Sequence, residues 1–508
     1  MDDKQKTDIE AVNPVQEPQP VVGEIKDLNK ADAALEFLRQ GHDVPVMKPE
    51  DERRLKRKVD WRIVPLMLAC YLLQYLDKTL INYANVMGLQ KDTGITGNQY
   101  SQLAMIFYVS YLCLEFPHSW GIQRFPTAKY IGIMVTLWGL ILACTSACSN
   151  WAGLVTTRVL LGVFESAIAP SLIVITAMWY KRHEQPPRMG IWYLGTGGGT
   201  IVGSLISFGF QHYSSSGFTS WQIMFLVCGL ITVAVGITVI IVLPDNPMKA
   251  HFLSREEKVW AIERLRANQT GIENKHFKLQ QFIECFTDPQ TYLLALITIS
   301  SNVPNGAVSS FQATIIKSFG YTSKETALLS IPAGAVSIVS ILAATNVAGR
   351  YNQRGLNVIC LLIPGVIGAA LMAFLPASNK AGKLIGNYMT NCIGASLPLI
   401  YSWVGANYAG HTKKVTMNAT LLISFCLGNI IGPLTFTEAS APDYIPAKIA
   451  IIVTCTAAMG LTLMLRAYYI WENKKRDKMM VERRLSHIVN VEFADRTDRE
   501  NIEFRYML

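Results

Sequence analysis

Residues 62–88 read RIVPLMLACYLLQYLDKTLINYANVMG, a mostly apolar run that carries two formal charges, Asp77 and Lys78. A helix rises about 1.5 Å per residue, and the apolar core of a bilayer is about 30 Å thick. A helix that ended at Leu76 would reach only about 20 Å and could not cross. The apolar residues after Lys78 must therefore continue the helix, which places both charges near the middle of a membrane span.

Charged side chains at this depth are costly, and they usually face a water-filled cavity or a partner charge. Neighbouring residues of a helix point about 100° apart, so Asp77 and Lys78 are poor partners for each other. We expect each of them to find a partner on another helix. The alternative is an interfacial position on a helix that begins earlier. The preceding run DERRLKRK, residues 51–58, is too charged to favour that alternative.

The composition indicates an all-α polytopic membrane protein. Of the 508 residues, 50% are hydrophobic and only 16% are charged, where a soluble protein would have about a quarter charged. The apolar runs are long and unbroken, which favours helices over the short alternating strands of a β-barrel. The first residues lack the pattern of a cleavable signal peptide, so we expect the first span to act as the insertion signal. We attribute the net charge of +9 to membrane topology and not to nucleic-acid binding.

Twelve transmembrane helices are predicted, in two halves of six. The predicted spans are residues 62–88, 98–120, 130–149, 151–179, 188–212, 221–243, 290–317, 325–348, 355–376, 383–405, 414–436 and 447–471. The predicted segments are a disordered N-terminal arm with a basic collar (1–58), a first six-helix half (59–243), a linker (244–289), a second six-helix half (290–471) and a C-terminal tail (472–508).

Lysine and arginine gather in alternate loops, from the collar at residues 51–58 to the run KKRDK at residues 474–478. The positive-inside rule then places both termini in the cytosol. In the linker, Ser254 followed by Glu257 is a capping box, and apolar residues follow at helical spacing. We expect a short amphipathic helix on the cytosolic face there.

The fourth predicted span adds two more buried charges. Arg158, Gly162 and Glu165 are spaced i, i+4 and i+7, which places them on one helix face. Glu165 lies about halfway along its span, at the same depth as Asp77. Lys78 and Arg158 are candidates to bind a substrate carboxylate, and Asp77 or Glu165 to carry a proton. The alternative is a structural salt-bridge network.

Other charged and small residues suggest packing more than transport. Glu115 is expected to be an interfacial charge or part of a gate salt bridge. Gly195, Gly199 and Gly203 recur every four residues, a spacing that lets helices approach closely. We see no metal site, hydrolytic triad or nucleotide motif in the sequence, and no cofactor is expected.

The seventh span is unusually polar and is interrupted by Pro304, which favours a cavity lining. The tenth span is similarly polar. Helix-packing polar residues remain the alternative at each position. The candidate substrate-binding residues from these two spans are Asn302, Asn305, Gln312 and Asn391.

Four motifs carry a resemblance to a known family: YLLQYLDKTLINYANVMGL at residues 71–89, QRFPTAKY at 123–130, RVLLGVFESAIAPS at 158–171 and FADRTDRENIEFRYML at 493–508. Together they resemble the fungal allantoate permease family, which are anion:cation symporters of the major facilitator group. The resemblance covers about residues 50–508. It implies a major facilitator fold in which spans one, four, seven and ten line the pathway.

The resemblance also implies proton-coupled symport of a small organic anion by alternating access. The pattern Asp77-Lys78 with Asn82-Tyr83-Ala84 is similar to the allantoate-type branch, so allantoate, ureidosuccinate, a dipeptide or a related carboxylate is expected, with Asn82 as a further substrate-binding residue. Nicotinate, biotin, pantothenate or cysteine remains an alternative, as does a nutrient receptor that signals without transport. We expect a functional monomer in the plasma membrane.

Overall fold

The computed structural model describes residues 47–181, 184–213, 217–266, 278–351, 353–483 and 497–508. The predicted disordered arm lies, up to residue 46, outside the described residues. Among the described residues every regular element is a helix. The first half contains α2 (Pro49–Met87), α3 (Leu89–Thr93), α4 (Gly97–Arg124), α5 (Thr127–Cys144), η1 (Thr145–Ala147), α6 (Trp151–Glu165), α7 (Ile168–Trp179), α8 (Gln185–Tyr193), α9 (Gly195–Phe210) and α10 (Ser220–Val242).

The linker and the second half are also helical. The linker contains η2 (Pro247–Lys249), α11 (Arg255–Arg266) and α12 (Leu279–Thr287). The second half contains α13 (Pro289–Ser318), α14 (Ser323–Leu329), α15 (Ile331–Tyr351), α16 (Arg354–Phe374), α17 (Lys380–Thr390), η3 (Ile393–Ala395), α18 (Ser396–Asn407), α19 (His411–Leu434), η4 (Glu438–Ser440) and α20 (Ile445–Arg483).

Each predicted span corresponds to one helix or to a helix interrupted once. The fourth span is broken between α6 and α7, the fifth between α8 and α9, the eighth between α14 and α15, and the tenth between α17 and α18. Judged by length and composition alone, eight helical segments of the described chain are long and apolar enough to cross a membrane. The all-α, twelve-span prediction is confirmed, and the more polar spans are the ones that a hydropathy criterion does not find.

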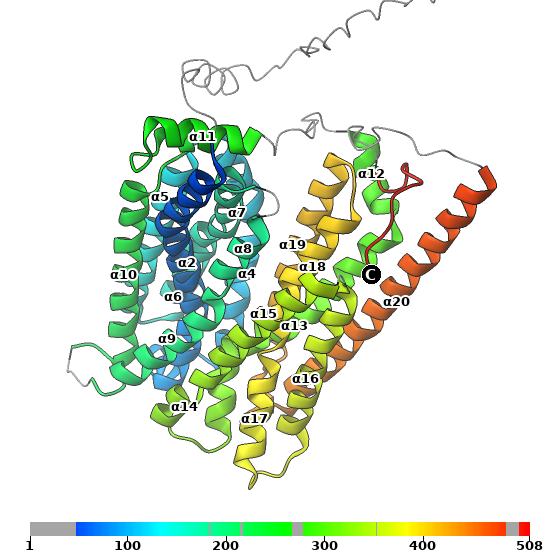
Figure 1. Ribbon diagram of the computed structural model, residues 1–508. Coiled ribbons are helices and arrows are strands. Elements are labelled where there is room, and N and C mark those ends of the chain that lie inside the picture. Colours follow the sequence, from blue (N-terminus) through cyan, green and yellow to red (C-terminus); the bar gives the residue numbers. More distant parts are fainter. Residues whose placement is uncertain (1–46, 182–183, 214–216, 267–277, 352, 484–496) are drawn as a thin grey trace, which may run out of the picture.

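The two halves lie side by side and repeat the same packing (Figure 1). In the first half α2 packs on α9 and α5 on α10, as α13 packs on α19 and α16 on α20 in the second. Across the halves, α4 meets α19 and α9 meets α15, which are also equivalent pairs. This repetition is the pseudo-twofold symmetry expected of two related six-helix units around a central site.

One end of the bundle carries α11 and α12, and we call it the linker face. Helix α11 lies across the ends of the first-half helices there (Figure 1), and its first turn has the predicted capping box. The Ser254 amide donates to Glu257, and the Glu257 amide donates to the Ser254 hydroxyl. The C-terminal segment lies at the same face, near α12.

Helix α2 begins at Pro49, earlier than we expected, so the basic collar is not part of a disordered arm. Its charges have partners beyond the apolar part of the bundle. Lys58 lies 2.6 Å from Glu257 of α11, and Asp60 lies 2.8 Å from Arg188 of α8. These pairs let a helix continue through a highly charged sequence, because the charged turns protrude at the linker face and do not enter the apolar layer.

Hydrogen bonds join the halves at the face opposite the linker. Tyr100 donates to the carbonyl of Ser310 at 2.9 Å, and Ser101 donates to the carbonyl of Phe436 at 2.8 Å. The Asn85 amide donates to the Thr314 hydroxyl at 3.0 Å. Toward the linker face the helices of the two halves diverge (Figure 1). The bundle is therefore held together mainly at the opposite face.

The predicted close approach of small residues is present between α9 and α2. A Cβ atom on Gly199 would lie 2.9 Å from the carbonyl oxygen of Leu72, and one on Gly195 would lie 2.8 Å from the Leu72 amide nitrogen. These contacts are with backbone, which cannot move aside cheaply. The glycines therefore position α2, the helix that carries Asp77 and Lys78.

We expect Gly199→Leu to lower the amount of folded protein strongly, because overpacking typically costs about 1–3 kcal/mol and here meets backbone atoms. Gly209→Leu on the same helix is the matched control, since a Cβ atom there has no neighbour within 4 Å. Fluorescence-detected size-exclusion chromatography measures both variants. Equal yields for the two variants would contradict the packing account.

The C-terminal segment, residues 497–508, belongs to the predicted tail and is packed into the second half. Lys413 is fully buried between three carboxylates, at 2.8 Å from Asp288, 2.8 Å from Asp498 and 2.9 Å from Glu284. Burial, and then the Asp498 charge, raises the pKa of Tyr506, so its hydroxyl stays protonated and donates to Asp498 at 2.7 Å.

We expect Lys413→Met to destabilise the protein by about 3–5 kcal/mol, because it leaves buried carboxylates without their cation. Lys414→Met is the matched control, since Lys414 lies at the surface and donates to the carbonyl of Gly405. The melting temperature in detergent should fall for the first variant and stay near wild type for the second. A similar melting temperature for Lys413→Met and wild type would show that the ion pairs of Lys413 contribute little to the stability of the protein.

Candidate functional site

Four charged residues from two helices line one small cavity inside the bundle. Asp77 and Lys78 come from α2, and Arg158 and Glu165 come from α6. The space between them is about 10 Å³, room for about one water molecule. The other lining residues are Ile81, Ala104, Phe107, Tyr108, Ser309 and Ser310. In this conformation the side chains close around the charges, so a substrate has to displace some of them.

Asp77 and Lys78 each meet a partner on another helix, as we expected. The indole nitrogen of Trp138, on α5, donates to Asp77 Oδ2 at 2.7 Å. Lys78 Nζ lies 3.4 Å from Glu165 Oε1. The two charges of α2 are therefore directed to different neighbours, because consecutive side chains on a helix point in different directions.

The Lys78 ammonium is also surrounded by aromatic rings. It lies 5.8 Å from the centroid of Phe107, 5.9 Å from Tyr108 and 5.5 Å from Tyr111, all on α4. Cation–π attraction is stronger when the cation is shielded from water. These three rings keep a cation tolerable at this depth even when its carboxylate partner is protonated.

Glu165 is the last residue of α6, where the helix breaks before α7. It is fully buried, and neither of its carboxylate oxygens has a hydrogen-bond partner among the described residues. Its only ion-pair partner there is the Lys78 ammonium. Asp77 differs, because one of its oxygens accepts the Trp138 bond and only Oδ1 is without a partner.

Arg158 is the most unusual of the four residues. Its side chain is buried, with 4% of the residue exposed, and it lines the cavity. Within the described part of the chain its guanidinium makes no ion pair and no hydrogen bond, although Glu165 lies two turns away on the same helix. The Asp77 carboxylate attracts this cation without direct contact, so an anion that enters the cavity could accept hydrogen bonds from the guanidinium that Asp77 does not accept.

The uncharged polar residues that we predicted to bind substrate do not line this cavity. Asn82 accepts a hydrogen bond from the Ala313 amide at 3.1 Å, and so connects the halves. Asn305 donates to Asn429 at 3.0 Å, and Asn302 donates to the carbonyl of Thr298 at 2.8 Å. In this conformation these residues support helix packing.

Two further predicted residues also lie outside the cavity lining. Asn391 ends α17 and donates to the carbonyl of Asn387 at 3.0 Å. Gln312 is buried, and its amide nitrogen has no partner among the described residues. The seventh span reaches the cavity instead through Ser309 and Ser310, which the polarity of that span indicated only in general terms.

Glu115 makes no salt bridge within the described chain, so the gate salt bridge that we considered for it is not formed in this conformation. It lies on α4 with 3% of the residue exposed, and its Oε2 atom has no hydrogen-bond partner there. The predicted span ends at residue 120, so Glu115 is expected close to the end of the span. The helix, however, continues to Arg124, which places Glu115 more than two turns inside.

The sequence profile of the Major Facilitator Superfamily matches residues 67–433. A thiamine pathway transporter of Saccharomyces cerevisiae is 41% identical over 499 residues, which are 95% of this chain and 94% of the relative. An allantoate permease of the same yeast is 35% identical over 494 residues, 94% of this chain and 91% of the relative. A high affinity cysteine transporter of that yeast is 28% identical, over 93% of this chain and 90% of the relative.

Among solved structures, a bacterial homologue of the human lysosomal transporter Spinster, in an inward-facing and occupied conformation, superposes with a TM-score of 0.60. The alignment covers 80% of this chain and 96% of the bacterial chain, at 14% sequence identity. At that identity the match speaks for the fold alone.

Proposed function

We propose a function for this protein on the basis of its family: the chain belongs to the Major Facilitator Superfamily. It is a multi-pass secondary transporter with a small-molecule substrate, and not an enzyme. Beyond this, we infer that it carries a small organic anion together with a proton, by alternating access. The resemblance to the allantoate permease relatives supports allantoate, ureidosuccinate, a dipeptide or a related carboxylate as the substrate class.

One observation supports an anionic substrate most directly: the buried guanidinium of Arg158 lines the central cavity and makes no direct ion pair or hydrogen bond in the described chain, where Asp77 attracts it only from a distance. Lys78 is already paired with Glu165, and Asp77 already accepts from Trp138. A carboxylate can accept two parallel hydrogen bonds from a guanidinium, which gives orientation as well as attraction. Arg158 is therefore the residue that we assign to the substrate carboxylate, with Lys78 adding positive charge.

Proton coupling follows from the Glu165–Lys78 pair in this account. Protonation of Glu165 would release Lys78, and the released ammonium could then attract the substrate anion toward Arg158. Loss of the proton would restore the pair and weaken the hold on the substrate. Asp77 is the less suitable proton carrier because its bond from Trp138 stabilises the charged carboxylate.

A thiamine-pathway compound is the second candidate, because the 41% identical relative is a thiamine pathway transporter. The two candidates differ in the charge of the substrate. Uptake of radiolabelled allantoate, a dipeptide, cysteine and thiamine by uptake-deficient yeast that expresses the protein separates them. We expect a carboxylate to be taken up, and uptake of thiamine alone would overturn the anion proposal.

We also propose that the linker face is cytosolic, with both termini on that side, and that the protein resides in the plasma membrane as a functional monomer. The joined opposite face and the diverging linker face support an inward-facing conformation (Figure 1). Protease added to sealed cells should leave an N-terminal tag intact. Cleavage of that tag from outside would contradict the proposed topology.

A further inference from the structure

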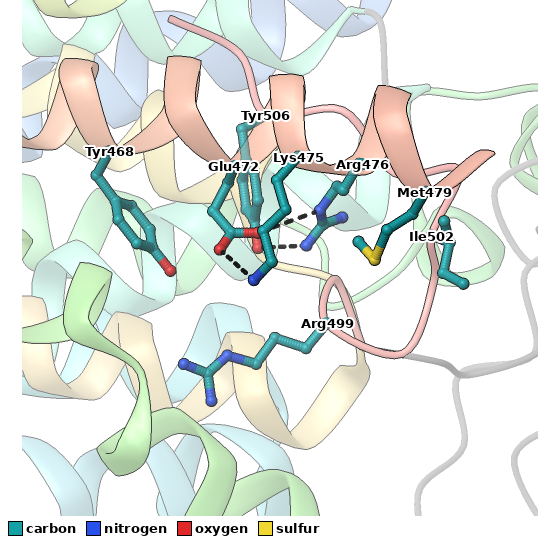
Figure 2. A pocket seen from close by; sticks show the side chains of 8 residues that line it. All are labelled: Tyr468, Glu472, Lys475, Arg476, Met479, Arg499, Ile502 and Tyr506. Atoms are coloured by element: carbon teal, nitrogen blue, oxygen red, sulfur yellow. Dashed lines mark hydrogen bonds and ion pairs between the residues drawn. The ribbon is translucent and has the colours of Figure 1, made fainter. Parts of the chain in front are cut away.

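A second cavity, of about 250 Å³, lies at the linker-face end of α20, well away from the central charges. It is enclosed on one side by α20 and on the other by the C-terminal segment (Figure 2). Four lining residues carry formal charge: Glu472, Lys475 and Arg476 from the helix, and Arg499 from the segment. The lining thus has three cationic side chains and one carboxylate.

The anionic partners present do not match these cations one for one. Glu472 is shared, at 3.3 Å from Lys475 Nζ and 3.7 Å from Arg476 Nε. Arg499 Nε lies 3.5 Å from Asp288, but that carboxylate is also 2.8 Å from Lys413. Among the residues that line the pocket, three cations therefore face one carboxylate, while Arg499 is also attracted by the carboxylates around Lys413.

The cations of the pocket differ in how far they are exposed. Arg476 is buried and fixed, because it donates to the carbonyls of Asn501 and Phe504 at 3.1 and 3.0 Å. Lys475 and Arg499 have more exposed side chains, at 50% and 37%. One buried cation and two more exposed cations therefore line the same pocket, and the exposed pair can be reached by an anion from solvent.

The pocket lies where α20 leaves its apolar region. Trp471 is 56% exposed, and the Lys475 ammonium lies 5.0 Å from its ring centroid. Exposed tryptophans concentrate at the membrane interface, and basic residues that directly follow a span attract anionic headgroups. The pocket is therefore at the depth of lipid headgroups at the linker face.

We propose that this pocket binds a phosphate-bearing anion, held by Lys475, Arg476 and Arg499. A phosphorylated lipid headgroup and a soluble phosphate ester offer the same chemistry to these cations. In either case the phosphate links α20 to the C-terminal segment, and so reinforces the docking of that segment on the second half. The site is independent of the transported substrate.

Native mass spectrometry of the detergent-purified full-length protein tests the site. The probes are phosphatidylinositol phosphate, phosphatidylinositol without the extra phosphate, and the inositol phosphate headgroup without acyl chains. Wild type should retain the phosphorylated lipid in preference to the unphosphorylated one. Equal retention of the headgroup alone identifies a soluble phosphate ester as the ligand, and weaker retention of it identifies the lipid.

Matched variants on the same helix separate the pocket from general surface charge. Lys475→Gln should weaken phosphate binding about fivefold, as expected for one cation near a membrane surface. Lys474→Gln removes an exposed lysine that does not line the pocket, and binding should change by less than about twofold.

The pocket carboxylate gives a test of opposite sign. Glu472→Gln removes the anion that competes with phosphate and should strengthen binding about fivefold. Asp477→Asn is its control, since Asp477 is exposed and pairs with Arg505 outside the pocket. Melting temperatures near wild type confirm that each variant is folded. Equal effects of pocket and control variants, or no preference of wild type for the phosphorylated lipid, would overturn the proposal.

Discussion

Replacing Arg158 by Gln should abolish substrate binding while the protein still reaches the membrane. The guanidinium makes no direct ion pair among the described residues, so its removal breaks no salt bridge, although Asp77 loses the electrostatic attraction of a nearby cation. Loss of one member of a buried charge pair with the substrate costs about 2–5 kcal/mol, which weakens binding by at least about thirtyfold. Surface level and equilibrium binding of the radiolabelled substrate measure the two effects separately.

Arg158→Lys is the matched control, because it keeps the charge but loses the two parallel hydrogen bonds of the guanidinium. We expect it to bind substrate more weakly than wild type and more strongly than Arg158→Gln. If Arg158→Gln bound substrate as wild type does, Arg158 would have no role in recognition. A loss of surface protein in Arg158→Gln would instead show that the residue is structural.

Replacing Glu165 by Gln should separate exchange from accumulation. Glutamine resembles the protonated acid, so the variant should bind substrate and exchange it across the membrane. It should lose accumulation driven by a proton gradient, and the ratio of inside to outside substrate should fall to about one. Counterflow and gradient-driven uptake in proteoliposomes measure the two activities.

The structural alternative for Glu165 is a simple ion pair with Lys78, whose partners lie 3.4 Å apart. Removing one partner would then cost about 3–5 kcal/mol of stability, and removing both would restore it. The variant Lys78→Gln/Glu165→Gln distinguishes the two accounts. If this double variant accumulates substrate like wild type, neither residue has a transport role.

The transmembrane helices could be predicted from the sequence, because membrane spans must satisfy their backbone polar groups internally and must have a minimum length. Counting helical rise along the sequence also placed Glu165 at the depth of Asp77, and helical spacing placed Arg158 on the same helix face as Glu165. Their pairing could not be predicted in this way. The partner of Lys78 depends on how α2 and α6 rotate against each other, and Trp138 carries no sequence signal that marks it as the donor to Asp77.

Other errors have a common physical cause. The seventh and tenth spans are polar, but many of their amides pack helices together, as Asn305 does with Asn429. Polarity alone does not separate a cavity lining from a packing contact. The docking of residues 497–508 was missed because its stability depends on Lys413 and Asp288, which are distant in sequence.

Transport by the purified protein in proteoliposomes tests the central claim most directly. With the interior of the vesicles alkaline and allantoate, a dipeptide and cysteine offered in turn outside, we expect one radiolabelled carboxylate to accumulate above its external concentration. A protonophore should collapse that accumulation to equilibrium, and Glu165→Gln should behave as wild type does with the protonophore present. Entry of a carboxylate only to equilibrium in wild type, with no effect of the pH gradient, would contradict proton-coupled anion symport.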